Sequence, residues 1–351
     1  MADLISAETQ WWENQAAAET AAAAALLEPA HRERWKYTPA AKVVGLLAAA
    51  DPASEKPADA ELVAVSEQLS SDDVLAYSPE AAGFLARQGN LRILRLDADA
   101  EVSNLPQDGI PTLIQVNQGV HCELHCLAEH SQHFSAVQQM LWIQLGPGAH
   151  LTHCNNFLDD VAQWQYVHVE VRGGAHYRQH NHSQGSSLHR QDTQVRLIEP
   201  GAEASLFSSA VVGQRAHFDQ QVRMEHCAPH TRSEQAFHTL ALADAKVTFN
   251  GRIHIHEGCD GSNAQLSNKN VALEKTATIN TKPELEIYAD DVQCSHGATV
   301  GQLDEVHEFY CASRGIPPAA ARKLLCRAFL SGTTRGAGAE RAMQKYAELL
   351  S

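Results

Sequence analysis

The sequence has no long apolar run. Its longest apolar stretches, residues 21–27 and 43–50, are far shorter than the roughly 20 residues that a membrane-spanning helix needs. The first residues, MADLISAETQWWENQ, contain neither a basic cluster followed by an apolar segment nor a run rich in arginine. They therefore resemble neither an export signal nor an organelle transit peptide. From these absences we expect a soluble, cytoplasmic protein whose eight cysteines are free thiols rather than a disulfide framework.

Basic residues are also few. The 27 Lys and Arg residues stand against 42 Asp and Glu residues, which gives a formal net charge of -15 at pH 7. A long nucleic-acid-binding surface needs a clustered basic face that displaces counterions from the phosphates. The composition therefore argues against a nucleic-acid partner.

Several motifs of nucleotide binding and catalysis are missing. Neither GxxxxGKS nor GxxxxGKT is present, and the segment GPGAHL at residues 146–151 lacks the third glycine of a dinucleotide-binding fingerprint. The hydrolase motif GxSxG and the metalloprotease motif HExxH do not occur either. We therefore predict that this chain has no ATP site and does not hydrolyse ATP itself.

The residues that are present divide the chain into three regions. Residues 1–90 are rich in alanine and predict helices, with a linker at residues 51–61 that holds two prolines. Residues 91–300 contain short segments that alternate apolar and polar residues, spaced too closely for crossover helices. Residues 301–351 return to helical periodicity. We predict a mainly β core between an N-terminal helical region and a C-terminal helical domain.

The strand spacing alone does not choose the architecture of the core. About 200 residues of closely spaced strands can form a sandwich, a barrel or a stacked solenoid. No strict repeat is visible, but Ile253 and Ile255 are followed 32 residues later by Leu285 and Ile287. This loose recurrence is weak support for stacking.

The C-terminal region predicts three amphipathic helices. Asp304 can cap the first helix and Gly315 can end it, and two prolines open the second. Residues 312–351 hold seven Lys or Arg residues against two Glu residues, in a chain that is acidic as a whole. Folding does not require this asymmetry, which favours a partner with an acidic or mixed groove. The predicted apolar faces are Val306, Phe309 and Tyr310; then Ala321, Leu324, Leu325, Ala328 and Phe329; and then Met343, Tyr346, Ala347 and Leu350.

Histidine is unusually frequent, with 20 residues, and it occurs in pairs. His121 and His125 would lie roughly 13 Å apart along a strand, too far to share one ion, so we expect them on a solvent-facing row above core cysteines. His254 and His256 would lie roughly 7 Å apart and could share an ion. No third ligand is near them in the sequence, so a surface pair is the simpler interpretation. The histidines of residues 178–182 and 226–230 receive no assignment.

Cys294 and His296 form the strongest candidate site. In an extended backbone both side chains project from the same face with Cα atoms about 6.6 Å apart, so a thiolate and an imidazole can bind one soft metal. The alternative is that Cys294 is a small core residue that continues from Val292 and that His296 lies in a turn. A hydrolytic Cys–His pair is disfavoured because residues so close on one strand rarely reach the geometry of nucleophile and base.

The segment KPELEIYADDVQCSHGATVGQLDEVHEFYCASRGIPPAAARKLLCRAFL, residues 282–330, resembles the C-terminal signature of the SufD family. Members of this family are subunits of the SUF iron-sulfur cluster assembly machinery. The upstream segment FNGRIHIHEG, residues 249–258, fits the strand repeats of the same family. The paralogous SufB family is similar in its RG-plus-helix ending, but it is not expected to carry KPELEIYADDVxCSHGATVG.

The resemblance implies a fold and a role. It implies a right-handed parallel β-helix, residues 91–300, between the two helical regions, and a non-enzymatic subunit. It also implies that the chain pairs with SufB at the end of the β-helix, and that residues 301–351 dock the ATPase SufC, which drives a conformational change. An isolated chain could instead form a homodimer.

The resemblance also implies functional residues. In the family, the Cys and His of the CSHG motif are functional residues at the SufB contact, and these are Cys294 and His296 here. They would hold iron or a transient iron-sulfur cluster shared with SufB, or relay sulfur. The residues that we expect to bind SufC are Arg322, Lys323, Leu324, Leu325 and Phe329. Whether the assembled complex also binds a flavin is a question that this sequence leaves open.

Two other classes of function compete with this interpretation. A β-helix enzyme acting on acidic polysaccharides would have an exposed groove with clustered carboxylates or basic clamps, and an export signal. A general metal-binding protein would explain the many histidines and cysteines, and it would hold metal stably on the isolated chain.

Overall fold

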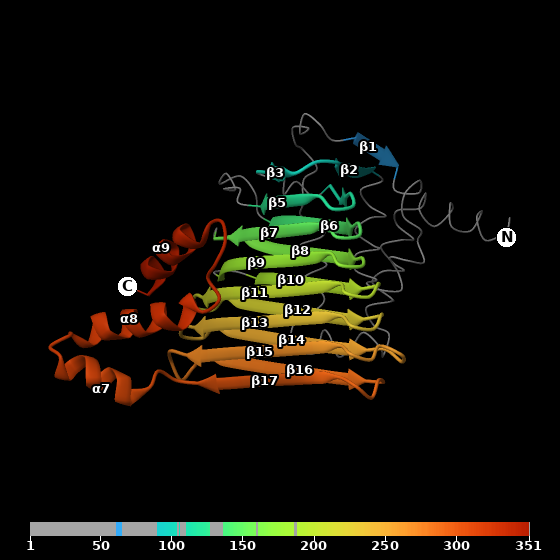
Figure 1. Ribbon diagram of the computed structural model, residues 1–351. Coiled ribbons are helices and arrows are strands. Elements are labelled where there is room, and N and C mark those ends of the chain that lie inside the picture. Colours follow the sequence, from blue (N-terminus) through green and yellow to red (C-terminus); the bar gives the residue numbers. More distant parts are fainter. Residues whose placement is uncertain are drawn as a thin grey trace, which may run out of the picture.

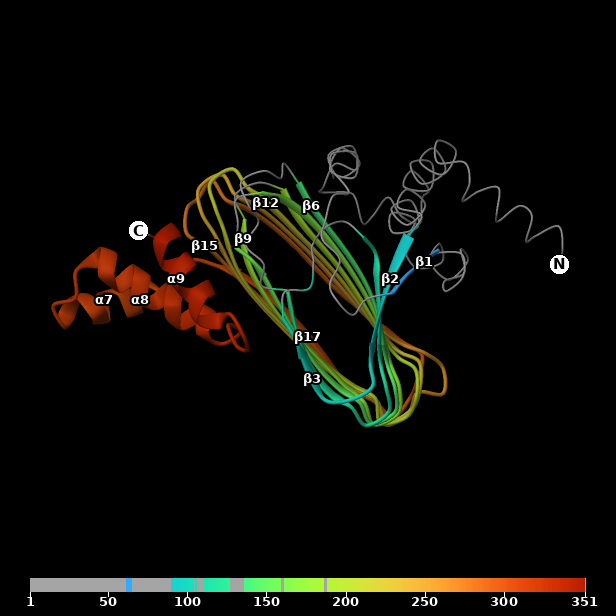
Figure 2. The same cartoon turned by 90° about the horizontal axis from the view of Figure 1, so that it is seen from above.

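The computed structural model describes residues 61–64, 90–103, 105, 110–126, 136–158, 161–185 and 188–350. Their strands form two sheets that face each other along a common stack (Figures 1 and 2). One sheet has nine strands in the order β1-β2-β4-β6-β8-β10-β12-β14-β16, and the other has eight in the order β17-β15-β13-β11-β9-β7-β5-β3. Strands that follow one another in sequence from β2 onward lie in opposite sheets. The core is therefore a parallel β-helix, the solenoid that strand spacing alone had left open.

The strands of the two sheets have the following residue bounds. The first consists of β1 (Glu61–Ala64), β2 (Asn90–Leu96), β4 (Thr112–Val116), β6 (Ala136–Leu145), β8 (Ala162–Val171), β10 (Leu188–Leu197), β12 (His217–His226), β14 (Lys246–Ile255) and β16 (Thr278–Ile287). The second consists of β3 (Ala100–Val102), β5 (His121–Cys126), β7 (His150–Phe157), β9 (His176–Gly185), β11 (Glu203–Val212), β13 (Arg232–Ala241), β15 (Asn263–Ala272) and β17 (Gln293–Gly301).

Three successive coils contain a tight turn with a glycine in the left-handed conformation. Gly148, Gly174 and Gly201 have φ values of 66°, 65° and 76°, which L side chains rarely adopt. Each is followed by an alanine that is fully buried. A Cβ on Gly201 would lie 3.5 Å from the backbone nitrogen of Gly174, so these turns stack closely on one another. The Gly-Ala pair therefore marks the coil period.

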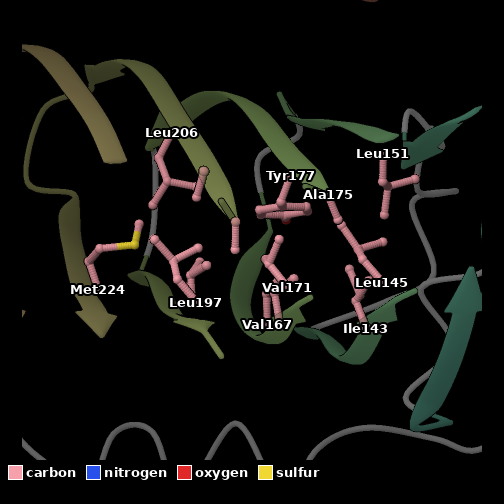
Figure 3. Packing of buried hydrophobic residues seen from close by; sticks show 14 of the residues in the cluster. Ile143, Leu145, Leu151, Val167, Val171, Ala175, Tyr177, Leu197, Leu206 and Met224 are labelled. Atoms are coloured by element: carbon pink, nitrogen blue, oxygen red, sulfur yellow. The ribbon is translucent and has the colours of Figure 1, made fainter. Parts of the chain in front are cut away.

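Apolar ladders fill the interior between the sheets. Ile143 pairs with Val169, Val169 with Val195, Val195 with Met224, and Met224 with Ile253. Figure 3 shows the neighbouring residues Val167, Val171 and Leu197 of one sheet close to Tyr177 and Leu206 of the other. Each buried aliphatic side chain contributes about 1.5–3 kcal/mol, so the ladder stabilises every coil against its neighbours. The 32-residue recurrence is also explained, because Ile253 pairs with Leu285 and Ile255 with Ile287.

A second interior layer is polar. Gln139, Gln165, Gln191 and Gln220 are paired in register along one sheet. Gln165 donates to Gln139 at 2.7 Å, and Gln220 donates to Gln191 at 3.0 Å. Gln191 in turn donates to the hydroxyl of Ser183 at 3.1 Å. Each of these hydrogen bonds lowers the cost of burying an amide, so the bonded pairs favour the observed register of neighbouring coils.

Three helices follow the β-helix: α7 (Glu305–Ser313), α8 (Pro318–Ser331) and α9 (Ala339–Leu349). They lie together beside the eight-stranded sheet (Figures 1 and 2), where α8 contacts β13 and α9 contacts β9. As predicted, Asp304 caps α7, with its carboxylate accepting a bond from the amide of Val306 at 2.8 Å, and Gly315 follows with φ of 77°. In the part of the chain that is described, no helix has both the length and the apolar character needed to cross a membrane.

The predicted apolar faces of the helices need correction. Leu324 is 51% exposed and Ala328 is also exposed, whereas Ala321, Cys326 and Leu330 are buried. The buried face of α8 is therefore rotated from the predicted one, because it packs against Val211 of β11 and Leu240 of β13.

The first predicted face is present, since Val306, Phe309 and Tyr310 lie on one side of α7, and this apolar face is exposed. The predicted apolar face of α9 agrees better with the structure, because Tyr346 is buried and Met343 and Leu350 pack beside it.

Most of the predicted N-terminal helical region, residues 1–90, lies outside the described residues. The exception within it is β1, which pairs antiparallel with β2 and matches Glu61 with Ile93. This short segment is therefore a strand and not part of a helix. With two adjacent apolar residues in only four positions, the segment ELVA is too short to distinguish a strand from a helix by its sequence pattern.

Candidate functional site

Cys294 and His296 lie on β17, the last strand of the eight-stranded sheet. In the register with β15, Cys294 pairs with Ala264 and His296 pairs with Leu266, both of which face the apolar interior. The two side chains therefore share the inward face of the strand, as their spacing predicts. The turn alternative for His296 is wrong, because His296 lies within the strand.

The two residues differ in burial. Cys294 is partly buried and packs against the interior cluster, whereas His296 is exposed because no coil follows on that side among the described residues. Burial raises the pKa of the Cys294 thiol, and a hydrogen bond with the backbone of Ala264 partly offsets this effect. The thiol is therefore protonated at neutral pH until an ion or a base removes the proton.

The site lies on an open edge of the fold. Within the described residues no strand continues the sheet beyond β17 or the opposite sheet beyond β16, so both strands present unpaired backbone groups. Large apolar side chains are exposed at the same end: Ile287 (40%), Tyr288 (63%) and Val300 (52%). Exposed apolar residues beside an unpaired strand edge are typical of an interface with another chain.

The C-terminal helices are attached to the β-helix by specific polar contacts. The Tyr346 hydroxyl donates to the backbone carbonyl of Ser209 at 2.7 Å and accepts from the amide of Ser183 at 3.0 Å. His182 Nε2 donates to the carbonyl of Arg335 at 3.0 Å, and His238 Nδ1 donates to the carbonyl of Phe329 at 2.7 Å. His182, in the unassigned segment 178–182, is therefore a structural anchor.

The residues predicted to bind a partner ATPase occupy different environments. Arg322 donates to the carbonyl of Leu273 and to the carboxylate of Glu274, each at 2.8 Å. Its guanidinium is therefore already paired within the chain and is less available to a partner. Leu324 is exposed and Lys323 is partly exposed. Leu325 is partly buried, and so is Phe329, whose ring stacks on His238 with centroids 4.8 Å apart. Lys323 and Leu324 are thus the most available of the five.

The expected solvent-facing row of His121 and His125 is wrong for His125, which is buried beneath two neighbouring carboxylates. His121 is exposed, whereas His125 is buried between the carboxylates of Glu101 at 3.3 Å and Glu123 at 3.2 Å. His125 is thus a buried strand residue in contact with two carboxylates and not part of a shared site with His121. His254 and His256 face outward with their rings stacked, 4.0 Å between centroids.

Comparison with known proteins assigns the family. Residues 90–329 match the family model described as "SUF system FeS cluster assembly, SufBD core domain". The chain is 30% identical over 206 residues to the iron-sulfur cluster assembly protein SufD of Escherichia coli K12, which covers 58% of this chain and 48% of the relative. It is 32% identical over 189 residues to the SufBD family protein slr0076 of Synechocystis, covering 53% of this chain and 42% of the relative.

A SufB protein is also similar. The iron-sulfur cluster assembly protein SufB of Bacillus subtilis is 28% identical over 160 residues, covering 46% of this chain and 34% of the relative. The chain spans about half the length, or less, of these relatives. The resemblance to the SufD family that residues 282–330 predict is confirmed. Because the family model covers more than two thirds of the sequence, the chain belongs to the SufBD core family of SUF iron-sulfur cluster assembly proteins.

Proposed function

We propose that this chain is a non-enzymatic scaffold subunit that pairs with SufB through the last coil of its β-helix. The observation that carries the proposal is the position of Cys294 and His296 on the inward face of an edge strand. A thiolate and an imidazole are suitable ligands for iron, but two ligands cannot complete its coordination. A partner that continues the sheet beyond β17 would bring further ligands to the same place.

The exposed surface at this end supports the same pairing. An edge strand with free backbone groups can accept a strand from another chain, and the exposed Ile287, Tyr288 and Val300 would be buried by that contact. Iron and sulfide are the substrates of this site rather than resident cofactors. In the proposed complex, Cys294 either binds iron with His296 or carries sulfur to it.

The C-terminal helices are the proposed contact for SufC. The exposed Phe309 and Leu324 would form the apolar centre of the contact, and Lys323 its basic rim. Because Tyr346, His182 and His238 attach this domain to β9, β11 and β13, a movement of the helices driven by SufC would be transmitted to the β-helix. ATP hydrolysis would then move the cluster site without any nucleotide bound to this chain.

Copurification with SufB and SufC tests each of the two proposed surfaces separately. Val300→Asp places a charge on the strand edge, and Phe309→Asp places one on α7; both side chains are exposed, so neither change should unfold the chain. We expect Val300→Asp to lose SufB and keep SufC, and Phe309→Asp to lose SufC and keep SufB. Retention of both partners by either variant would show that the corresponding surface is wrongly placed.

A further inference from the structure

A cluster of metal-ligating side chains lies outside the site described above, on the outer wall of the β-helix. Glu225 is the second-last residue of β12, Cys227 follows the end of β12, and His256 follows the end of β14 in the next coil. Their ligating atoms all lie within 4.8 Å of one another. His256 Nε2 lies 3.5 Å from Glu225 Oε2.

The coil register brings these residues together. His226 pairs with Ile255, so the next residues along the two strands, Cys227 and His256, lie one above the other. The backbone continues the ladder there, since the amide of His256 donates to the carbonyl of His226 at 3.1 Å. Glu225 and Cys227 are two residues apart and share the outward face. The preceding coil therefore supplies the two further donors that His256 lacks in its local sequence.

The imidazole of His256 is held with an unsatisfied nitrogen towards the cluster. Its ring stacks on His254, 4.0 Å away, and Nε2 is buried without a hydrogen bond from any described residue. The Glu225 carboxylate lies 3.5 Å from this nitrogen, at the limit of a hydrogen bond, so the nitrogen keeps its coordinating capacity for an ion bound between the carboxylate and the thiol. His254 serves as the support rather than a ligand, because its Nδ1 lies 3.2 Å from the guanidinium of Arg252.

The donor set is that of a borderline divalent transition metal. Thiolate, imidazole and carboxylate together suit Zn²⁺ or Fe²⁺, whereas Mg²⁺ and Ca²⁺ prefer oxygen ligands. Ligands of a tetrahedral Zn²⁺ site lie roughly 3.3–3.7 Å apart, so side-chain rotation alone would close the remaining distance. Glu225 is 13% exposed and His256 40% exposed, which leaves an entry path and an open fourth position for water.

We propose that Glu225, Cys227 and His256 bind one divalent transition-metal ion, of the Zn²⁺ or Fe²⁺ type, on the outer face of the β-helix. The site is separate from Cys294 and His296, which face inward on the last coil. On binding, a metal–sulfur bond forms and the thiol proton of Cys227 is released to solvent. Burial raises the pKa of that thiol to about 11, partly offset by Arg196, so the proton is present before the ion arrives.

Titration of the full chain with Co²⁺, after removal of metals by a chelator, tests the proposal without any partner protein. Co²⁺ reports a thiolate ligand through its sulfur-to-metal absorption band. We expect one Co²⁺ per chain with this band, displaced by Zn²⁺ and by anaerobic Fe²⁺ but not by Mg²⁺. The absence of a saturable band would overturn the proposal, and so would displacement by Mg²⁺.

Variants identify the ligands. Cys227→Ser should abolish the band, and Glu225→Gln and His256→Gln should each weaken Co²⁺ binding by roughly tenfold or more. The matched controls are Cys294→Ala, which removes the thiol of the other candidate site, and His230→Asn, which changes an exposed histidine of the same turn. Both controls should keep the band, and circular dichroism should show that all five variants are folded. A band that persists in Cys227→Ser, or that is lost in Cys294→Ala, would assign the metal elsewhere.

Discussion

The hydroxyl of Tyr346 reaches the backbone of Ser209 across the boundary between α9 and the β-helix, at 2.7 Å. The same oxygen accepts a bond from the amide of Ser183, so one buried side chain satisfies two backbone groups of adjacent strands. This contact makes α9 part of the folded core rather than an appendage. It is also the most direct route by which a force on the helices would reach the β-helix.

Tyr346→Phe should loosen α9 without removing its apolar packing. The variant leaves the Ser183 amide and the Ser209 carbonyl without their buried partner, which costs about 1–3 kcal/mol. We expect faster hydrogen exchange across residues 339–349 and a lower melting temperature. Tyr310→Phe is the matched control, because Tyr310 is 57% exposed, and it should change neither quantity. Equal exchange in the two variants would contradict the anchoring role.

The buried histidines should make the protein sensitive to acid. Burial lowers the pKa of His182 to about 4, and the pKa of His226 is likewise lowered to about 4 by burial. In the unfolded chain these groups titrate near 6.5, so the unfolded state takes up protons first as the pH falls. Their stabilising contribution is complete above about pH 6.5 and is lost progressively towards pH 4.

His182→Gln tests this assignment by denaturant unfolding at pH 7 and pH 5. A histidine that stays neutral in the fold contributes up to about 2 kcal/mol to the difference in unfolding free energy between these two pH values. We expect the variant to be less stable at pH 7 but to lose less stability on acidification. His230→Gln, at an exposed position, serves as the control. An unchanged pH dependence in His182→Gln would show that His182 is not buried as a neutral group.

Gln191 should be essential to the polar ladder inside the coils. Gln191→Ala removes the acceptor of the Gln220 amide and the donor to Ser183, and it leaves a cavity. Together these losses should lower the free energy of unfolding by about 2–4 kcal/mol. Gln265→Ala, at an exposed position on β15, should change it by less than about 0.5 kcal/mol. Similar values for the two variants would contradict the proposed role of the ladder.

Arg322 and Lys323 should respond differently to charge reversal. Arg322→Glu loses the contacts with Leu273 and Glu274 and places two carboxylates together, so it should lower the melting temperature as well as SufC binding. Lys323→Glu should weaken SufC binding in a salt-dependent manner with little change in melting temperature. Calorimetry and binding measured at two salt concentrations separate the effects. If Arg322→Glu melts at the wild-type temperature, its contacts with the β-helix do not stabilise the fold.

The sequence is informative where the determinant is local. The alternating segments predict strands, and Asp304 and Gly315 mark the two ends of α7, because a cap depends on residues within one turn. The shared face of Cys294 and His296 is equally local, since it follows from the period of a strand. The Gly-Ala pairs at residues 148–149, 174–175 and 201–202 also recur with the coil period, but they were not recognised as a repeat before the left-handed turns were known.

Contacts between coils are harder to predict. Glu225 and Cys227 lie about one coil before His256 in the sequence, so the register that unites them is not visible in a local window. The buried face of α8 is missed for the same reason, because Cys326 and Leu330 are selected by Val211 and Leu240 of distant strands. In both cases the contact depends on residues of distant strands, which a local sequence pattern does not include.

The most direct test of the account is the iron and sulfide content of the complex purified with SufB and SufC. Cys294→Ala and His296→Ala should assemble at normal yield, because Cys294 is small and His296 is exposed, and both should hold severalfold less iron. Cys122→Ala, an inward-facing cysteine near the opposite end, and His121→Ala, an exposed strand histidine, should hold the normal amount. Full iron content in both site variants would contradict the assignment of the cluster site to the last coil.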